Sequence, residues 1–359
     1  MEIFRRFRNY RLLQRSERLS RNGDRTAALN TLLEANRREP EASLEQAIVD
    51  LLLSEELTRQ TEPPGIQAEV PISPLKHRFV SGEIPEVDAT DLTAPLLQNA
   101  IADSGYLVVR NYFAQDHCDS IRQSIDESLN ARADAVEAGN VEEAKNAWYY
   151  ASPHFPGCHV AHSKRNDKQV FSRTGSIRVI DSPRGTFRVL EAYRERGIKQ
   201  LVEAYFGQDA LIATRKWVFR LIEPIPGMDD GIGGGWHQDG QFMGDGVLAL
   251  NMWVALTHCG QGTSAPGITL LPKRIKEIVE FGTRGAKLNW AVGSDLVEEL
   301  AADAPIISPT FAPGDALFFD HYSLHRSGHA SNQTENRYAL ESWFYAKTGT
   351  AGNAVISHF

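Results

Sequence analysis

The stretch from residue 210 to residue 346 carries short runs rich in β-branched and aromatic residues, separated by turns of Gly, Pro and Asp. The runs are LIATRKWVFRLIE, LALNMWVALT, GITLLP, DALFFD, SLHRSG and RYALESWFYA. The only strong helix signal among them lies near residues 273 to 282. Strands that follow one another without intervening helices favour an antiparallel sandwich or barrel over a doubly wound sheet. We therefore expect a mainly β fold with helical additions.

The N-terminal part of the chain has a different pattern. Residues 1–60 predict an α-helical extension, because leucines at helical spacing precede Pro40 and a second apolar-periodic stretch begins near Ala42. Residues 61–91 are rich in proline and predict a linker or extended segment, and residues 92–359 form the expected main domain. The spacing of one tetratricopeptide-like hairpin is matched by Gly23, Ala28, Ala35 and Pro40. Two interpretations of the extension stay open, a helical unit packed on the main domain and a hairpin that binds a protein partner.

Composition narrows the class of partner. The net charge of -8 gives no reason to expect nucleic acid, because phosphate binding needs a concentrated basic surface. A small-molecule substrate fits better. There is no run of eighteen apolar residues, so we expect no membrane span. The first 25 residues hold eight arginines, which leaves a targeting or membrane-surface segment open beside a solvated helix face.

The cysteines indicate the compartment. The chain has three of them, far apart and without a Cys-x-x-Cys pair, so neither a disulfide framework nor a thiolate zinc site is expected. A cytoplasmic location is the interpretation that follows. The three are Cys118, Cys158 and Cys259.

Two His-x-Asp triplets are candidates for a metal site. On an extended strand, residues two apart point to the same face, so His237 and Asp239 can reach one cation, and the glycines of 231 to 235 leave the approach open. The other triplet, His117-Cys118-Asp119, lies in a stretch with helical periodicity. There the two side chains diverge, so we exclude it as a metal site.

A third ligand is expected between residues 312 and 344, which contain three histidines. His325 stands in a strand-like run, whereas His321 and His329 lie in more turn-like surroundings. His325 is therefore the preferred third ligand. Two histidines and one carboxylate form a facial triad, which leaves open positions on Fe(II).

An open iron site of this kind needs a chelating cosubstrate. A 2-oxo acid chelates iron through its keto oxygen and adjacent carboxylate, and its far carboxylate needs a fixed cation. Arg337 suits that role, because a guanidinium binds a carboxylate through two parallel hydrogen bonds. Ser327 lies on the face of His325 and adds a further donor. The alternative for Arg337 is a surface ion pair.

In these motifs the sequence resembles the phytanoyl-CoA dioxygenase family of Fe(II)/2-oxoglutarate-dependent oxygenases. The resemblance covers roughly residues 95 to 346 and rests on SGYLVVRNYF with its following helix, WHQDG, NMWVALTHCGQGTSAPGITLLPKRIKE, and PGDALFFDHYSLHRSG with Arg337, in the family's order. It departs at THCGQGTSAPG, where the family has an acidic and Asn-Gly-rich turn.

The resemblance implies a double-stranded β-helix core (jelly-roll, cupin-like). It also implies metal ligands at His237, Asp239 and His325, and 2-oxoglutarate held by Arg337, usually with help from Ser327. The carboxylate of Asp239 favours hydroxylation, since related halogenases have a small residue in its place.

Several neighbouring positions are assigned less directly. In LALNMWVAL, Asn251 and Trp253 share a face, and we place both among the cofactor-binding residues. Two roles stay open for Asn251: a hydrogen bond to 2-oxoglutarate or substrate, or a barrel-rim amide satisfied by backbone. Lys216 and Arg220 share one face of TRKWVFRLIE, opposite Trp217 and Phe219, and either face is a candidate for lining the pocket. The irregular insert 140–185 offers basic groups for an anionic substrate or for solvent, namely His154, His159, His162, Lys164 and Arg165.

The expected function is that of a non-haem Fe(II)- and 2-oxoglutarate-dependent oxygenase. It would hydroxylate a small-molecule or acyl substrate with dioxygen and form succinate and CO2. Two alternatives stay open. One is a non-catalytic binding protein with a relic barrel and a partner-binding hairpin, and the other is a cupin-type metalloenzyme that does not use 2-oxoglutarate.

Overall fold

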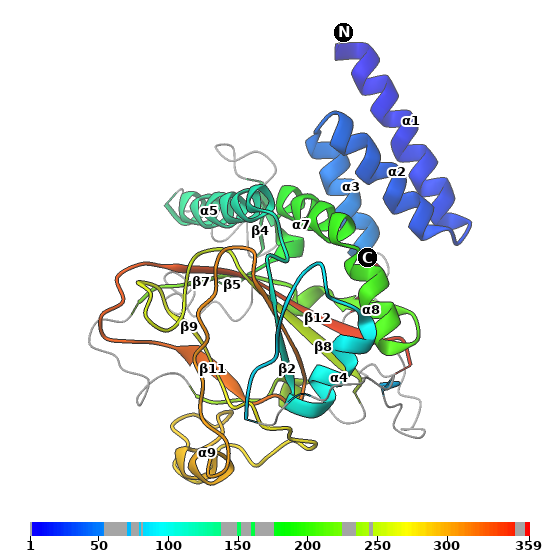
Figure 1. Cartoon of the computed structure of the whole chain (residues 1–359). Helices are drawn as coiled ribbons and strands as arrows, with labels where there is room; N and C mark the ends of the chain where they lie inside the picture. Colours follow the sequence, from blue (N-terminus) through cyan, green and yellow to red (C-terminus); the bar gives the residue numbers. More distant parts are fainter. Residues whose placement is uncertain are drawn as a thin grey trace.

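The computed structural model describes residues 2–53, 70–72, 79, 82–137, 149–151, 159–161, 176–224, 235–243, 247–348 and 356–359. Within them a large mixed sheet forms the centre of the molecule (Figure 1). Its main path runs in the order β1 (Glu86–Asp88), β2 (Tyr106–Arg110), β10 (Ala316–Asp320), β8 (Ala249–Ala255), β12 (Arg337–Ala346), β6 (Ala210–Ala213) and β13 (Ile356–Ser357). Two further strands join it beside β12, β7 (Val218–Ile222) and then β5 (Ser176–Arg178).

Strands β8 and β12 form the middle of this sheet. All seven residues of β8 are buried, as expected for an apolar strand covered on both faces. Strand β12 pairs with β8 along one edge. Along its other edge β12 pairs with β7 over residues 337–341 and with β6 over residues 344–346. A single 3-10 turn, η2 (Thr214–Lys216), separates those two strands. LIATRKWVFRLIE is therefore two strands joined by a turn and not the single strand-like run that its composition predicted.

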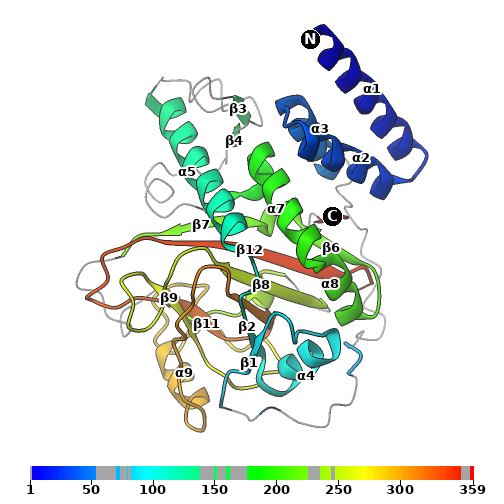
Figure 2. The same ribbon diagram turned by 45° about the horizontal axis from the view of Figure 1, so that its top comes forward.

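A smaller sheet faces the large one. It consists of β9 (Gly267–Leu270) and β11 (His325–Gly328), paired antiparallel. Ile268 and Leu270 pack in one buried cluster with Trp253 and Leu317 from the large sheet. Figures 1 and 2 show β9 and β11 on the side of the large sheet opposite to the helices α5 and α7. A third pair, β3 (Tyr149–Ala151) with β4 (His159–Ala161), lies apart from both sheets.

Helices cover the outer face of the large sheet. Leu340 and Phe344 of β12 pack in one core with Val189 and Tyr193 of α7. The Tyr193 hydroxyl also shares a buried hydrogen bond with Ser342 of β12. These helices are α4 (Ala94–Ser104), α5 (Gln115–Glu137), α7 (Pro183–Arg196) and α8 (Ile198–Phe206), with the 3-10 turn η1 (Val179–Asp181) before α7.

The N-terminal residues form three helices, α1 (Glu2–Arg21), α2 (Arg25–Arg38) and α3 (Ala42–Leu53). Pro40 lies between α2 and α3, in keeping with its role as a helix breaker. Ile48 and other apolar residues of α3 belong to the same core as α7, and the half-buried Arg184 of α7 pairs with the buried Glu45 at 3.4 Å. These helices therefore pack on the main domain, while α1 projects outward (Figure 1). Partner binding by the helices stays a prediction.

Two further expectations need correction. Strand β1 lies inside residues 61–91, the predicted linker or extended segment, and pairs in parallel with β2, so the sheet of the main domain begins at residue 86 and not after residue 92. The segment 273–282 is not a helix, and the nearest one is α9 (Ser294–Leu300). Tertiary hydrogen bonds override the helical pattern in that segment, because the Val279 N–H donates to the Gln238 side chain instead of to a helical carbonyl.

Two smaller observations complete the fold. Cys118 and Cys259 are buried free thiols, whereas Cys158 lies outside the described residues. In the part of the chain that the structure describes, no helix combines the length and apolar character needed to span a membrane.

Candidate metal centre

Three side chains singled out in the sequence, His237, Asp239 and His325, lie together. Each offers one ligand atom, and these atoms all lie within 4.8 Å of one another. The Asp239 carboxylate is 3.8 Å from the Nε2 atom of His237 and 3.9 Å from that of His325. Two donors each about 2.0–2.2 Å from one ion can be about 4 Å apart, so the carboxylate is placed to share an ion with either imidazole.

The backbone explains why the two histidines meet. His237 forms an antiparallel bridge with His325, the first residue of β11, through two N–H to carbonyl hydrogen bonds of 2.9 and 3.0 Å. Asp239 does not continue that strand. It begins the 3-10 turn η3 (Asp239–Phe242), and the Gly240 N–H donates to the His321 carbonyl. The expectation that His237 and Asp239 share one strand was therefore wrong, although their side chains do converge.

Both imidazoles are oriented through their second nitrogen. The Nδ1 atom of His237 lies 3.2 Å from the Gly235 carbonyl, and that of His325 lies 3.0 Å from the Ser323 carbonyl. A backbone carbonyl can only accept a hydrogen bond, so each Nδ1 carries the hydrogen and each Nε2 keeps its lone pair. This is the arrangement that metal-binding histidines commonly have.

Burial shifts the acid–base properties of the cluster. It lowers the pKa of His237 to about 3, helped by the neighbouring His325, so its imidazole is neutral at physiological pH. Burial also raises the pKa of Asp239, against the opposing influence of His325 and Lys216. Placing three such groups together in the interior costs free energy that a bound cation would offset.

Asn251 contacts the cluster directly. This residue of β8 is buried, and its amide Nδ2 donates a hydrogen bond to the Asp239 carboxylate. The sequence left a cofactor or substrate contact and a backbone contact open for this amide. In the structure the Nδ2 atom is directed at Asp239, and a contact of Asn251 with 2-oxoglutarate or substrate stays a prediction.

Gln238, between the two ligand candidates, is a functional candidate that sequence reasoning missed. Its side chain is buried and makes three hydrogen bonds, all to backbone groups of other segments. The only sequence signal was its position between His237 and Asp239, where strand alternation sends it to the opposite face.

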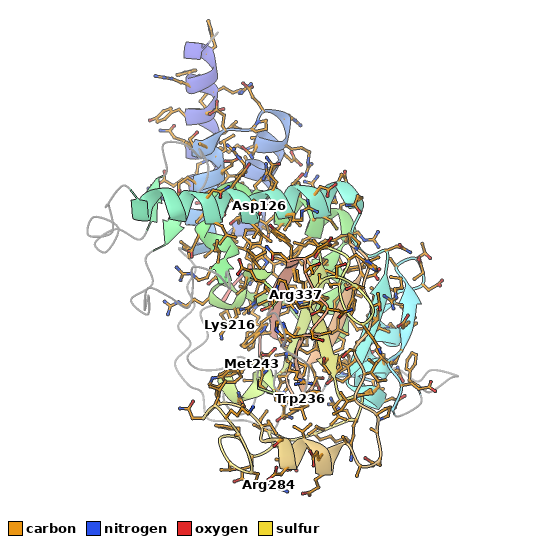
Figure 3. The ribbon with its side chains drawn as sticks, turned by 90° about the vertical axis from the view of Figure 1, so that its left-hand side faces the viewer. Asp126, Lys216, Trp236, Met243, Arg284 and Arg337 are labelled. Atoms are coloured by element: carbon orange, nitrogen blue, oxygen red, sulfur yellow. The ribbon has the colours of Figure 1, made fainter. Side chains whose placement is uncertain are left out.

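Arg337 is buried at the start of β12 (Figure 3). Its Nη1 donates to the Gly267 carbonyl at 2.5 Å, and its guanidinium lies 5.6 Å from the Trp253 ring centre. Its Nε has no hydrogen-bond partner among the described residues. Burial lowers the pKa of this arginine. With 3% of its surface exposed, the alternative of a surface ion pair was wrong.

The other two cofactor-binding candidates, Ser327 and Trp253, lie on β11 and β8. Ser327 is half-buried on β11 and alternates onto the face of His325. The neighbouring Gly328 pairs with Gly267, whose carbonyl Arg337 binds. Trp253 is buried, with its ring 5.0 Å from that of Phe311.

The structure shows which face of the 216–220 segment lies toward the metal centre and which lies toward the helices. Trp217 is fully buried toward the helices and donates to the Tyr193 hydroxyl at 3.0 Å. Arg220 forms a bidentate pair with Glu341 of β12, at 2.9 and 2.5 Å. The Lys216 ammonium lies 4.7 Å from the Trp343 ring centre, and its charge influences Asp239. Lys216 and Arg220 therefore lie on the metal-centre side.

Two aromatic rings flank His237. The Trp290 ring lies 5.7 Å and the Phe242 ring 6.2 Å from its imidazole, both edge-on. Phe242 is 43% exposed, which is unusual for a phenylalanine beside a buried cluster. These rings give the outer side of the centre an apolar wall.

The remaining candidates are not part of the cluster. His321 is buried with its ring against Tyr322, and His329 is buried elsewhere. His117 lies on α5 and pairs with Glu195 at 2.8 Å, remote from the centre. Of the basic residues of the insert, only His159 lies within the described residues, at the start of β4; His154, His162, Lys164 and Arg165 lie outside them.

Comparison with known proteins gives the following findings. In fold the chain is similar to AviO1 from Streptomyces viridochromogenes Tue57, at 15% identity and a TM-score of 0.43, over 72% of this chain and 97% of that one. It is also similar to the non-haem α-ketoglutarate-dependent epimerase SnoN from nogalamycin biosynthesis, at 15% identity and a TM-score of 0.40, over 72% of this chain and 87% of that one. The carbocyclase SnoK of the same biosynthesis gives 13% identity and a TM-score of 0.38, over 73% and 87%. No curated protein matches the sequence.

The family assignment rests on a different comparison. The family model described as phytanoyl-CoA dioxygenase (PhyH) matches residues 101–337, which is more than half of the chain. This family uses Fe(II) and 2-oxoglutarate, and the match spans the His237, Asp239 and His325 cluster together with Arg337. The chain belongs to the phytanoyl-CoA dioxygenase family.

Proposed function

We propose that this protein is a 2-oxoglutarate-dependent oxygenase whose iron is held by His237, Asp239 and His325. The observation that carries the proposal is the convergence of these three donors from two segments far apart in the sequence. Both imidazoles present Nε2 because backbone carbonyls hold their Nδ1 atoms. Two histidines and one carboxylate are the donor set of Fe(II) oxygenases that keep open coordination positions.

Arg337 is the proposed anchor for the far carboxylate of 2-oxoglutarate. A buried guanidinium whose Nε lacks a partner in the described part of the chain is poorly satisfied by the protein alone. A carboxylate would supply the missing acceptor and the opposite charge. Ser327 and Trp253 are the proposed neighbours of that carboxylate.

When bound, iron and 2-oxoglutarate would supply the oxidising chemistry, in which dioxygen is consumed, succinate and CO2 form, and the substrate is oxidised. The residues of this chain bind and orient. Asn251 fixes the Asp239 carboxylate through its amide. Burial keeps His237 neutral and able to donate its lone pair. Because a carboxylate occupies the position of Asp239, hydroxylation of a small-molecule or acyl substrate is the proposed reaction.

The proposed architecture is a double-stranded β-helix. In it, β9 and β11 belong to one wall, and the interior face of β8 and β12 belongs to the other. The shared buried cluster of Ile268, Leu270, Trp253 and Leu317 supports this arrangement. In this architecture, the bridge between His237 and His325 joins the segment of the first two ligands to strand β11, which carries the third ligand.

The experiment that tests the function is an anaerobic titration of metal-free protein with Fe(II) and then 2-oxoglutarate. A chelated 2-oxo acid should give a weak visible charge-transfer band, and air should then give succinate. Iron binding without the band would favour a cupin-type enzyme that does not use 2-oxoglutarate. Failure to bind iron would contradict the proposal and favour a non-catalytic binding protein.

A further inference from the structure

The side chain of Gln238 connects three separate segments of the chain. It is fully buried. Its Nε2 donates to the Tyr322 carbonyl at 2.7 Å and to the Glu277 carbonyl at 3.0 Å. Its Oε1 accepts from the Val279 N–H at 2.8 Å. Both amide protons and the oxygen are therefore used, so the side chain has a single well-defined position.

Gln238 itself and one of its three partners, Tyr322, lie close to the metal centre. Gln238 is the residue between His237 and Asp239, and Tyr322 precedes His325 by three residues. The amide consequently ties the segment of the first two ligand candidates to the connection that leads into β11. The Gln238 side chain lies on the face of its segment opposite to the side chains of His237 and Asp239, so it is not itself a candidate ligand.

The other two partners, Glu277 and Val279, belong to the loop 271–293. The same loop is attached to the metal-centre segment at two further points. The Gln241 Nε2 donates to the Trp290 carbonyl at 2.6 Å, and the Val292 N–H donates to the Trp236 carbonyl at 2.7 Å. Through these contacts the loop holds the Trp290 ring beside His237.

We propose that Gln238 is a positioning residue that couples the metal ligands to the loop 271–293. A cation that fixes His237 and Asp239 also fixes the backbone of residue 238 between them. The hydrogen bonds of the Gln238 side chain to Glu277 and Val279 then restrict the motion of the loop. Conversely, an ordered loop holds the ligands near their bound positions and strengthens metal binding. The inference rests on the proposed function, because it presupposes a cation at this cluster.

The first test is metal affinity, measured anaerobically with Co(II) through its visible absorption. Gln238→Met keeps the length and buried packing of the side chain but removes all three hydrogen bonds. Gln98→Met is the matched control, since Gln98 is also buried and donates to the Ala204 and Tyr205 carbonyls at 3.2 and 2.9 Å, between α4 and α8. We expect Co(II) affinity to fall roughly 10- to 100-fold in Gln238→Met and to stay unchanged in Gln98→Met. Equal affinity in wild type and Gln238→Met would overturn the inference.

The second test uses the wild-type protein, so it does not depend on a variant that folds. The loop carries three exposed trypsin sites, Lys276, Arg284 and Lys287, and Figure 3 shows Arg284 at the outer edge of the molecule. Co(II) should slow cleavage at these sites in the wild type, and this protection should be lost in Gln238→Met. Cleavage of the wild type at the same rate with and without bound Co(II) would overturn the coupling alone. A wild-type protein that binds no Co(II) would remove the proposed function as well, which keeps the two failures distinguishable.

Discussion

The Asn251 amide donates a hydrogen bond to the Asp239 carboxylate, across the interior between β8 and the turn η3. Asn251 pairs with Phe319 on one side and with Trp343 on the other, so its position is set by two strand registers of the large sheet. The Asn251 amide binds Oδ2 of Asp239, the oxygen nearer to His325, while Oδ1 lies nearer to His237, so a strand of the sheet orients the carboxylate between the two imidazoles. A carboxylate held in this way loses less rotational freedom when it binds a cation.

Replacing Asn251 by alanine should weaken metal binding without unfolding the protein. We expect Fe(II) affinity to fall by roughly 10- to 100-fold, the usual effect of removing a hydrogen-bond partner of a ligand. The measurement is anaerobic titration followed by the charge-transfer band with 2-oxoglutarate. Asn99→Ala is the control, because the Asn99 amide donates to the Pro95 carbonyl on the remote helix α4. A loss of the same size in both variants would show a general effect of stability and contradict the role of Asn251.

The residues of the metal centre illustrate how far a sequence specifies a site. His237, Asp239 and His325 could be singled out because residue type, spacing and local strand character are all local properties. The partners of Gln238, Asn251 and Arg220 could not, because each partner lies far away in the chain and is brought close only by tertiary packing.

The fold shows the same division. The short strands and turns between residues 210 and 346 were predictable from local composition, since turn residues and β-branched runs alternate there. The helix predicted at 273–282 was wrong because side chains outside the segment bind it: the Val279 N–H donates to Gln238, and the Arg274 guanidinium donates to Asp320. Hydrophobic period alone does not reveal such competing tertiary partners.

The three histidines of the 312–344 region should respond differently to substitution. His325→Ala should abolish Fe(II) binding and succinate formation, since a facial site with two protein donors holds iron poorly. His321→Gln should retain both, because His321 lies outside the cluster, with its ring against Tyr322. Iron content after anaerobic reconstitution and desalting distinguishes the two. Normal iron content in His325→Ala would contradict the ligand assignment.

Arg337→Met should separate cosubstrate binding from metal binding. The variant removes one charge-assisted interaction, which contributes roughly 1.5–3 kcal/mol, so the KM for 2-oxoglutarate should rise by about 10- to 100-fold. Fe(II) affinity should stay unchanged, because Arg337 is not part of the cluster. Arg188→Met is the control, a half-buried arginine of α7 that binds Ser124 and Glu127. An unchanged KM in Arg337→Met would argue for a different anchor.

The pH dependence of stability offers a test of the burial of His321. Burial lowers the pKa of His321 in the folded protein, against the opposing charge of Asp320. The unfolded chain has a histidine pKa of about 6.5, so below that pH the unfolded state takes up a proton that the folded state does not. The contribution is therefore neutral above about pH 6.5 and becomes destabilising as the pH falls, by up to about 1.4 kcal/mol per pH unit. His321→Gln removes this titration, so the difference between the thermal midpoints of metal-free protein at pH 7.5 and pH 5.5 should be smaller than in the wild type. A difference as large as in the wild type would mean that folding does not lower the pKa of His321 and that another buried group accounts for the acid sensitivity.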